Sequence, residues 1–191
     1  MSASNNNLDQ ELEWVKECLD GNVDCFDYLM KHSEQIVRGM VMNIVHDSTQ
    51  AEELAQLSFV TAFERLHQFK GESKFSTWVC QIALNKCRDH LRIVKRNRHN
   101  IDAEDYSANI EHGNNPEQET ATQQRDELLD NAINKLKPND REIVIFKYVC
   151  GYSYDVISQI LGCTVQTAKV RSFRARESLK SILEDMGINY G

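Results

Sequence analysis

The segment Ser153-Tyr-Asp-Val-Ile-Ser-Gln-Ile-Leu-Gly-Cys-Thr164, continued by Val165-Gln-Thr-Ala-Lys-Val-Arg-Ser-Phe-Arg-Ala-Arg176, has the pattern of two helices joined by a tight turn. Ser153 and Thr164 each precede an apolar run, and serine and threonine are favoured helix N-caps. At helical spacing the inward positions of the two runs are apolar: Tyr154, Ile157, Ile160, Leu161, Ala168, Ala175, Leu179 and Ile182. The segment therefore predicts a helix-turn-helix.

The second of these helices has a polar and basic outer face. Its N-terminal half directs outward Gln166, Thr167, Val170, Arg171 and Arg174. These are the positions that meet base edges when such a helix enters the major groove. Lys169 and Arg176 flank the face and suit phosphate contacts. A helical hairpin used only for packing is the alternative, but it would not need this density of cations.

A second DNA-binding pattern begins at Phe69-Lys-Gly-Glu-Ser-Lys-Phe-Ser-Thr-Trp78. This loop supplies Gly71 for close backbone approach, serines including Ser73 for hydrogen bonds, and three aromatic rings: Phe69, Phe75 and Trp78. Stacking on an aromatic ring stabilises a base by roughly 1 to 3 kcal/mol, comparable with the cost of unstacking one base. The loop is therefore predicted to trap a flipped base, with the alternative that Phe69 and Phe75 are core residues.

The helix predicted to follow, from about Ser76 to Arg96, has two faces. Cys80, Leu84, Cys87, Leu91 and Val94 form the side expected to pack on the domain. The other side carries amides and arginines: Gln81, Asn85, Arg88, Arg92 and Arg96. Amides pair with base edges and arginines bind phosphates, so this face is predicted to hold a nucleic-acid strand.

An upstream helix, from Gln50 to Leu66, is predicted to be a partner surface. Its core side gathers Ala51, Ala55, Phe59, Ala62 and Leu66. The opposite side places Leu57 and Val60 among polar residues that include Glu53, Gln56 and Glu64. An apolar strip rimmed by carboxylates suits docking of a basic helical partner, whereas a fully enclosed helix is the structural alternative.

Composition favours an all-α fold, because the 191 residues include only two prolines and eight glycines and show long amphipathic stretches. The formal charge is −7, but basic residues cluster in 86–98 and 161–180, while 101–130 holds nine acids against Arg125. We predict two small helical domains, 1–98 and 125–191, joined by an acidic flexible linker, 99–124.

Further helices are expected at Leu8–Leu19 and from Cys25 to about Val45, and the second set is expected to pass the helix-starting Pro138. No signal peptide or membrane span is evident, so a cytoplasmic protein is expected. Its six cysteines form no C-x-x-C pair, which favours small core residues over a disulfide framework or zinc site.

Together these segments resemble the extracytoplasmic-function group of the bacterial sigma-70 family. The resemblance covers about residues 20–98 and 125–185. It lies in the segments Ala51-Glu-Glu-Leu-Ala-Gln-Leu-Ser-Phe59, Phe69–Trp78, Ile82-Ala-Leu-Asn85, Arg141-Glu142, Tyr148-Val-Cys-Gly-Tyr-Ser-Tyr154, Ile157, Leu161-Gly162 and Thr167–Arg176. Several ordered matches are far more specific than a lone helix-turn-helix.

The resemblance implies a dissociable transcription initiation factor, with no enzymatic activity and no cofactor. The first domain would dock on the clamp coiled coil of core RNA polymerase and capture the opened minus-ten element of promoter DNA, and the second would recognise the minus-35 duplex. Contact with the polymerase flap and an anti-sigma factor is also implied. Carried over, Glu52, Glu53 and Gln56 would meet the clamp, Asn85 and Arg88 the minus-ten strand, and Thr167, Lys169, Arg171 and Arg174 the minus-35 groove.

Two positions depart from the family pattern. Leu57 replaces the acid that usually follows the glutamine of the clamp helix, so we hypothesise weaker docking that phosphorylation of Ser58 or Thr61 would restore. Ser172 replaces a bulky aliphatic residue on the inner face of the recognition helix, and Phe173 is the candidate to compensate.

Three other classes of protein are alternatives. A polymerase-independent helix-turn-helix regulator is the main alternative, although it has no need of a clamp-docking helix. A nucleic-acid enzyme lacks any metal cluster, phosphate loop or nucleophile-base pair in the sequence. A metal sensor requires Cys80, Cys87 and His90 to converge, and only Cys87 and His90 have helical i, i+3 spacing.

Overall fold

The computed structural model describes residues 3–101 and 121–188, which form helices joined by short loops, with no strand in these ranges. The elements are α1 (Ala3–Leu19), α2 (Asp24–Val45), α3 (Ser48–Glu64), the 3₁₀ helix η1 (Leu66–Gln68), α4 (Phe75–Ile101), α5 (Ala121–Lys135), α6 (Pro138–Val144), the π-helix η2 (Ile145–Val149), α7 (Tyr154–Leu161) and α8 (Val165–Asp185). The predicted all-α fold is confirmed.

Three helices begin at side-chain caps. The Asp47 carboxylate accepts a hydrogen bond from the Gln50 amide at 2.9 Å and begins α3. The Ser153 hydroxyl accepts from the Val156 amide at the start of α7, and the Thr164 hydroxyl accepts from the Thr167 amide at the start of α8. Each cap satisfies a backbone donor that the first helical turn leaves without an intrahelical partner.

The turn between α7 and α8 depends on Gly162, whose φ of 62° lies in the left-handed region. A side chain at this position would strain the backbone, whereas glycine adopts the conformation freely. The inward residues behave as predicted on both helices. Ile157, Ile160, Ala168 and Ala175 are buried, so the helix-turn-helix is confirmed.

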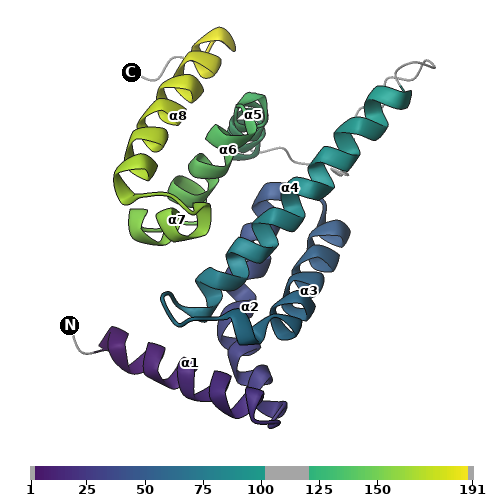
Figure 1. Cartoon of the computed structure of the whole chain (residues 1–191). Helices are drawn as coiled ribbons and strands as arrows, with labels where there is room; N and C mark the ends of the chain where they lie inside the picture. Colours follow the sequence, from purple (N-terminus) through teal and green to yellow (C-terminus); the bar gives the residue numbers. More distant parts are fainter. Residues whose placement is uncertain (1–2, 102–120, 189–191) are drawn as a thin grey trace.

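The first set of helices surrounds a core between α2, α3 and α4, with α1 crossing one end (Figure 1). The core side predicted for α3 is buried, including Leu66, which lies in η1 rather than in α3 itself. The second set comprises α5–α8, with α6 and α7 both packed against α8. Two helical sets are therefore present, as the sequence predicts.

The predicted linker, 99–124, is shorter at both ends than expected. Helix α4 continues to Ile101 and α5 begins at Ala121, so residues 99–101 and 121–124 belong to helices. Its central part, 102–120, lies outside the described residues. None of the described helices has both the length and the apolarity to cross a membrane.

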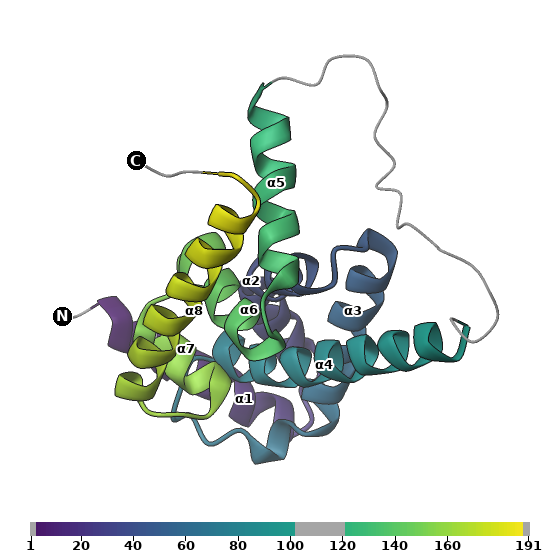
Figure 2. The same ribbon diagram turned by 90° about the horizontal axis from the view of Figure 1, so that it is seen from above.

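The two helical sets also contact each other. Helix α7 packs along α4 (Figure 2), and η2 lies against α2. Buried residues of both sets, including Cys80 of α4 and Ile157 of α7, belong to one continuous apolar cluster. The second set therefore covers one side of α4.

Candidate nucleic-acid interface

Helix α8 presents the basic face that the sequence predicts for DNA. Gln166, Lys169, Val170, Arg171 and Arg174 are exposed, as is Arg176, and only Thr167 is partly covered because it adjoins the Thr164 cap. Arg176 also lies over the Phe173 ring, 5.4 Å from its centroid. The structure brings the whole predicted set to one open surface of the second helical set.

Ser172 is fully buried on the inner face of α8, as expected, but the predicted compensation by Phe173 is wrong. The Phe173 side chain is 58% exposed and points away from the core. The Tyr154 hydroxyl lies instead 3.3 Å from the Ser172 hydroxyl, within hydrogen-bonding distance. A tyrosine from α7 therefore occupies the space that a bulky residue on α8 would fill.

The aromatic loop before α4 is mostly core. Phe75 is completely buried and Phe69 is 9% exposed, so the prediction that these rings stack on bases is not supported in this conformation. The Phe69 and Phe75 centroids lie 5.6 Å apart at 84°, an edge-to-face contact, and Phe26 packs edge-to-face on Phe75. Trp78 is half-buried against both.

Beside these rings the surface forms an open hollow of about 420 Å³. Its walls include Phe69, Lys70, Ser73, Trp78 and Gln81 of the first helical set, and Gln159 of the second. Ser73 is half-buried here and hydrogen-bonds its hydroxyl to the Lys74 carbonyl at 3.3 Å. The hollow combines the partly exposed Trp78 side chain with the Lys70 ammonium, the Glu72 carboxylate and side-chain amides, and an aromatic ring beside polar groups suits an unpaired base.

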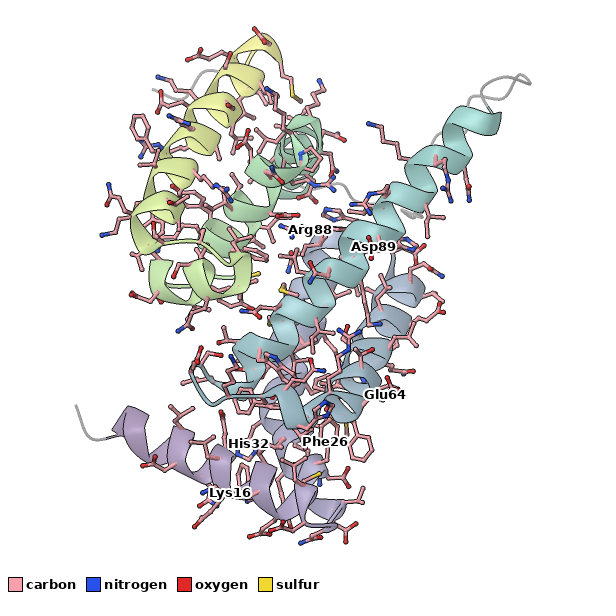
Figure 3. The ribbon with its side chains drawn as sticks, viewed as in Figure 1. Lys16, Phe26, His32, Glu64, Arg88 and Asp89 are labelled. Atoms are coloured by element: carbon pink, nitrogen blue, oxygen red, sulfur yellow. The ribbon has the colours of Figure 1, made fainter. Side chains whose placement is uncertain are left out.

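Two of the predicted strand-contacting residues of α4 are held by the second helical set. The Gln81 side-chain amide donates to the Gln159 carbonyl at 2.5 Å. The Arg88 guanidinium pairs with the Glu142 carboxylate through two parallel hydrogen bonds of 2.7 Å each. Figure 3 shows Arg88 on the side of α4 that faces α6. We call this pair of contacts the interset latch.

The Arg88–Glu142 pair is strong because its geometry is bidentate and one partner is buried. The Glu142 side chain is 8% exposed, against 38% for Arg88. The hydrogen bonds from Arg88 to Glu142 raise the pKa of the guanidinium, and burial opposes this. Removing Arg88 would leave a carboxylate buried without its counter-ion.

The remaining predicted residues of this face lie open to solvent. Asn85, Arg92 and Arg96 are exposed, and Arg92 forms an ion pair with Asp89 within α4 at 2.8 Å. The structure therefore divides the predicted strand-binding face into a held part and an open part.

Thiols line the contact between the sets. Cys80 and Cys87, expected to pack within their own domain, lie against the second set: the Cys80 and Cys150 thiols both approach the Tyr152 hydroxyl, and Cys87 lies near Glu142. Burial raises the pKa of Cys80 to about 12 and that of Cys150 to about 11. Burial also raises the pKa of the Tyr152 phenol. These groups therefore stay uncharged at neutral pH.

The metal-sensor alternative gains no support. Within the ranges that the structure describes, no three histidine, cysteine or acidic side chains gather into a metal-binding group. Cys80 and Cys87 are fully buried.

Helix α3 carries the predicted partner surface. Glu53, Gln56, Leu57, Val60 and Glu64 are all exposed, with Val60 at 54%. Phe63, which the sequence analysis did not include, extends the apolar strip and rests edge-to-face on Phe26 at 5.0 Å. Its three-residue spacing from Val60 is the signal that would have identified it.

One prediction on α3 is wrong and another stays a prediction. Glu52 pairs with Arg38 of α2 and accepts a hydrogen bond from Gln56 at 2.6 Å, and its contact with the clamp stays a prediction. Ser58 is fully buried and donates its hydroxyl to the Leu54 carbonyl at 2.6 Å, so a kinase could not reach it in this fold. Thr61 is partly exposed and remains a candidate.

The chain matches two family models that are consistent with this arrangement. Residues 29–99 match sigma-70 region 2, and residues 126–179 match sigma-70 region 4. The first range holds α3 and α4, and the second holds the helix-turn-helix.

Whole-chain relatives agree. The chain is 28% identical to the RNA polymerase sigma-H factor of Pseudomonas aeruginosa over 93% of this chain and 96% of that protein. It is 28% identical to the ECF RNA polymerase sigma factor SigW of Bacillus subtilis, over 90% and 96%. It is 27% identical to the ECF RNA polymerase sigma-E factor of Escherichia coli, over 90% and 93%.

Solved structures show the same fold. The sigma factor RpoE of Bartonella quintana, solved with the anti-sigma factor NepR, superposes with a TM-score of 0.62 at 23% identity, over 83% of this chain and 96% of that one. CnrH, solved with the cytosolic domain of CnrY, gives 0.66 at 20% identity, over 94% and 97%.

The alternative of a polymerase-independent regulator is excluded by these matches, because both sigma regions occur in order along one chain. The protein belongs to the extracytoplasmic-function group of the sigma-70 family, and it is a non-enzymatic transcription initiation factor that associates with RNA polymerase and directs it to promoters.

Proposed function

We propose that α8 reads the minus-35 duplex, that the hollow before α4 captures a flipped base of the minus-ten element, and that the exposed strip of α3 docks on the polymerase clamp. The observation that carries the minus-35 assignment is that cationic residues of α8 are exposed while small residues of the same helix are buried. Arg171 and Arg174 face solvent while Ala168 and Ser172 are buried, so the cations stand where a major-groove helix makes base contacts.

In the first helical set, Trp78 is the stacking ring and Lys70, Arg92 and Arg96 supply phosphate contacts. Lys70, Arg92 and Arg96 are exposed and Trp78 keeps an open edge in the hollow. Phe69 and Phe75 shape the hollow from beneath rather than stacking on DNA. Asn85 is exposed on the same face and supplies amide pairing with a base edge.

The interset latch keeps the free chain from using its full strand-binding face. Gln81 and Arg88 become available only when α7 and α6 move away from α4. Binding to polymerase would supply the free energy for this separation, because a partner shifts an equilibrium by its differential affinity for the two states. We therefore expect the isolated protein to bind promoter DNA poorly.

The exposed strip of α3 is suited to an apolar contact with the clamp that is bordered by charged residues. Leu57, Val60 and Phe63 are the exposed apolar residues, and Glu53 and Glu64 border them. The carboxylates steer a basic coiled coil while the apolar residues desolvate the contact. Phosphorylation of Thr61 would add negative charge at the edge of this strip and strengthen docking.

The partner set follows from the same surfaces: core RNA polymerase, through its clamp and flap, and promoter DNA. An anti-sigma factor is a further partner, since solved sigma factors of this fold are bound to one. The compartment that holds polymerase, the cytoplasm, is the expected location.

The decisive experiment is run-off transcription of fragmented genomic DNA with core polymerase, with and without the protein, followed by sequencing of RNA 5′ ends. Discrete new start sites that share two spaced upstream elements are expected, and the promoters so defined serve the tests below. The proposal fails if the protein binds core polymerase but no such sites occur.

The residue assignments are tested on those promoters. Leu57→Ala and Val60→Ala should each weaken core binding by about fivefold or more, since interface side chains of this kind contribute on the order of 1 kcal/mol or more. Thr49→Ala, exposed on the first turn of α3 and away from the strip, is the matched control and should bind normally.

A further inference from the structure

Helix α1 lies outside the range that matches sigma-70 region 2, which begins at residue 29, yet it touches the loop that forms the hollow. In Figure 1 it passes beside the segment between α3 and α4. The contact joins two parts of the chain that are far apart in sequence.

The central contact is made by Glu11. Its side chain is buried, with 5% of the residue exposed, and its carboxylate accepts a hydrogen bond from the Phe75 amide at 2.8 Å. Phe75 is the first residue of α4, so this amide has no partner within the helix. Glu11 therefore acts as the cap of α4, from 64 residues away in the sequence.

Helix α4 cannot supply this cap itself. The residue before its first turn is Lys74, whose ammonium group donates hydrogen bonds and cannot accept one. The first turn of α4 also contains no acidic residue. Glu11 thus supplies both the acceptor and the negative charge that a helix N-terminus favours.

The neighbouring residue of α1 restricts the loop a second time. Gly71 has a φ of +70°, and a Cβ atom placed on it would lie 2.5 Å from a terminal methyl carbon of Leu12. The Leu12 side chain therefore rests directly on the loop backbone at the one place where the loop has no side chain. Glu11 and Leu12 together hold the two ends of the segment 71–75.

We infer that Glu11 is a positioning residue for promoter opening: from α1 it fixes the start of α4 and the loop before it, so that the walls of the hollow that the first helical set supplies, around Trp78, are already in place when a base is extruded. This inference rests on the proposed capture of a minus-ten base by that hollow. A preformed site avoids the entropy cost of ordering the loop at the moment of capture. That cost matters because stacking and unstacking of one base nearly balance.

The test compares Glu11→Ala, Glu11→Gln and Glu13→Ala in holoenzyme assembled from core polymerase and the full chain. Glutamine keeps a side-chain oxygen that can accept from the Phe75 amide. Glu13 is exposed two residues along α1, where it accepts a hydrogen bond from the Gln10 side chain at 3.4 Å, so it controls for loss of charge on α1. Strand opening is measured by permanganate reactivity of unpaired thymines on a promoter defined by run-off transcription.

We expect Glu11→Ala to lower the open-complex fraction at limiting holoenzyme by about tenfold, the factor that corresponds to about 1.4 kcal/mol. Core affinity and binding of minus-35 duplex by the holoenzyme should stay within about twofold. Glu11→Gln should recover most of the opening, and Glu13→Ala should match the unmodified protein.

The inference is overturned if Glu11→Ala opens the promoter normally, or if core affinity falls as much as opening does, which would indicate a general folding role. It is also overturned if Glu11→Gln is as defective as Glu11→Ala. If Glu11→Ala does not fold, Leu12→Ala provides the same comparison, with a smaller expected loss of about threefold in opening alone. Failure of the unmodified holoenzyme to open any promoter would instead overturn the proposed function.

Discussion

Helices α4 and α8 carry the two basic faces of this sigma factor, but only the face of α8 is open along its whole length. On α8 the predicted base-contacting residues, including Arg171 and Arg174, are exposed. On α4, Gln81 and Arg88 are bound to the second helical set. A basic helical face in a sequence therefore identifies a binding surface without showing whether that surface is available in the free chain.

The largest effect is expected from removing the open face. The change of Arg171 and Arg174 together to alanine should lower promoter-directed transcription by about a hundredfold, since each base contact contributes roughly 1 to 3 kcal/mol. Run-off transcription at a fixed promoter is the measurement. Lys180→Ala, on the same helix where Lys180 pairs with Glu184, should have little effect. Equal losses in both variants would show that the effect is not specific to the face.

Uncovering the held face should have the next largest effect. Glu142→Gln keeps the shape of the side chain but removes the charge that holds Arg88. We expect about a tenfold rise in the affinity of the free protein for single-stranded minus-ten DNA, because hydrogen bonds to charged groups contribute about 1.5–3 kcal/mol and partial exposure of Arg88 reduces this. The radius of gyration from small-angle X-ray scattering should also increase.

The control for that variant is Asp89→Asn, which removes an exposed acidic partner from Arg92 on the same helix. It should leave the radius of gyration unchanged. If Glu142→Gln alters neither compactness nor affinity, the latch does not limit DNA binding.

A smaller effect should follow from ionising the thiols between the sets. The pKa of Cys80 is about 12 in the fold and 9.0 as its reference value, so the unfolded chain releases this proton first as pH rises. The contribution of the protonated Cys80 thiol to the free energy of unfolding is fully present below pH 9 and is lost between pH 9 and about 12. At pH 10 the free energy of unfolding should be about 1 kcal/mol lower on account of this thiol.

Urea unfolding at pH 8 and pH 10 measures this, and Cys80→Ala should show a shallower decline than the unmodified chain. An identical decline in both proteins would show that Cys80 keeps no raised pKa in the fold.

The smallest effect is expected from weakening the contact between Tyr154 and Ser172, which lies on the inner side of α8, behind its open basic face. Tyr154→Phe removes the hydroxyl that meets Ser172 and should lower the free energy of unfolding by about 0.5–1 kcal/mol, near the low end for a hydrogen bond. Thermal unfolding measures it, with the exposed Tyr148→Phe as control. The preferred minus-35 sequence should not change, since neither residue reaches the outer face.

Periodicity and caps were sufficient to predict most of the fold. The start of α3 at Asp47, the turn at Gly162 and the inward positions of α7 and α8 all depend on residues close together in sequence. The same local rules predicted the outer face of α8, because exposure there is decided within the helix-turn-helix itself.

The sequence was insufficient to predict burial or pairing where these depend on contacts between residues far apart in the chain. The burial of Phe75 depends on Phe26, and the pairing of Glu52 depends on Arg38, and neither partner is near in sequence. Gln159 and Glu142 likewise meet α4 only because the two helical sets pack together. No periodicity within one helix contains that information.

The latch joins two parts of one polypeptide, and this sets how it responds to protein concentration. An intramolecular contact has an effective concentration fixed by chain geometry, so dilution does not release it and overexpression does not saturate it. A separate inhibitor, in contrast, is titrated once the sigma factor outnumbers it. The fraction of molecules held closed by Arg88 and Glu142 should therefore be the same in a cell that makes few copies as in one that makes many.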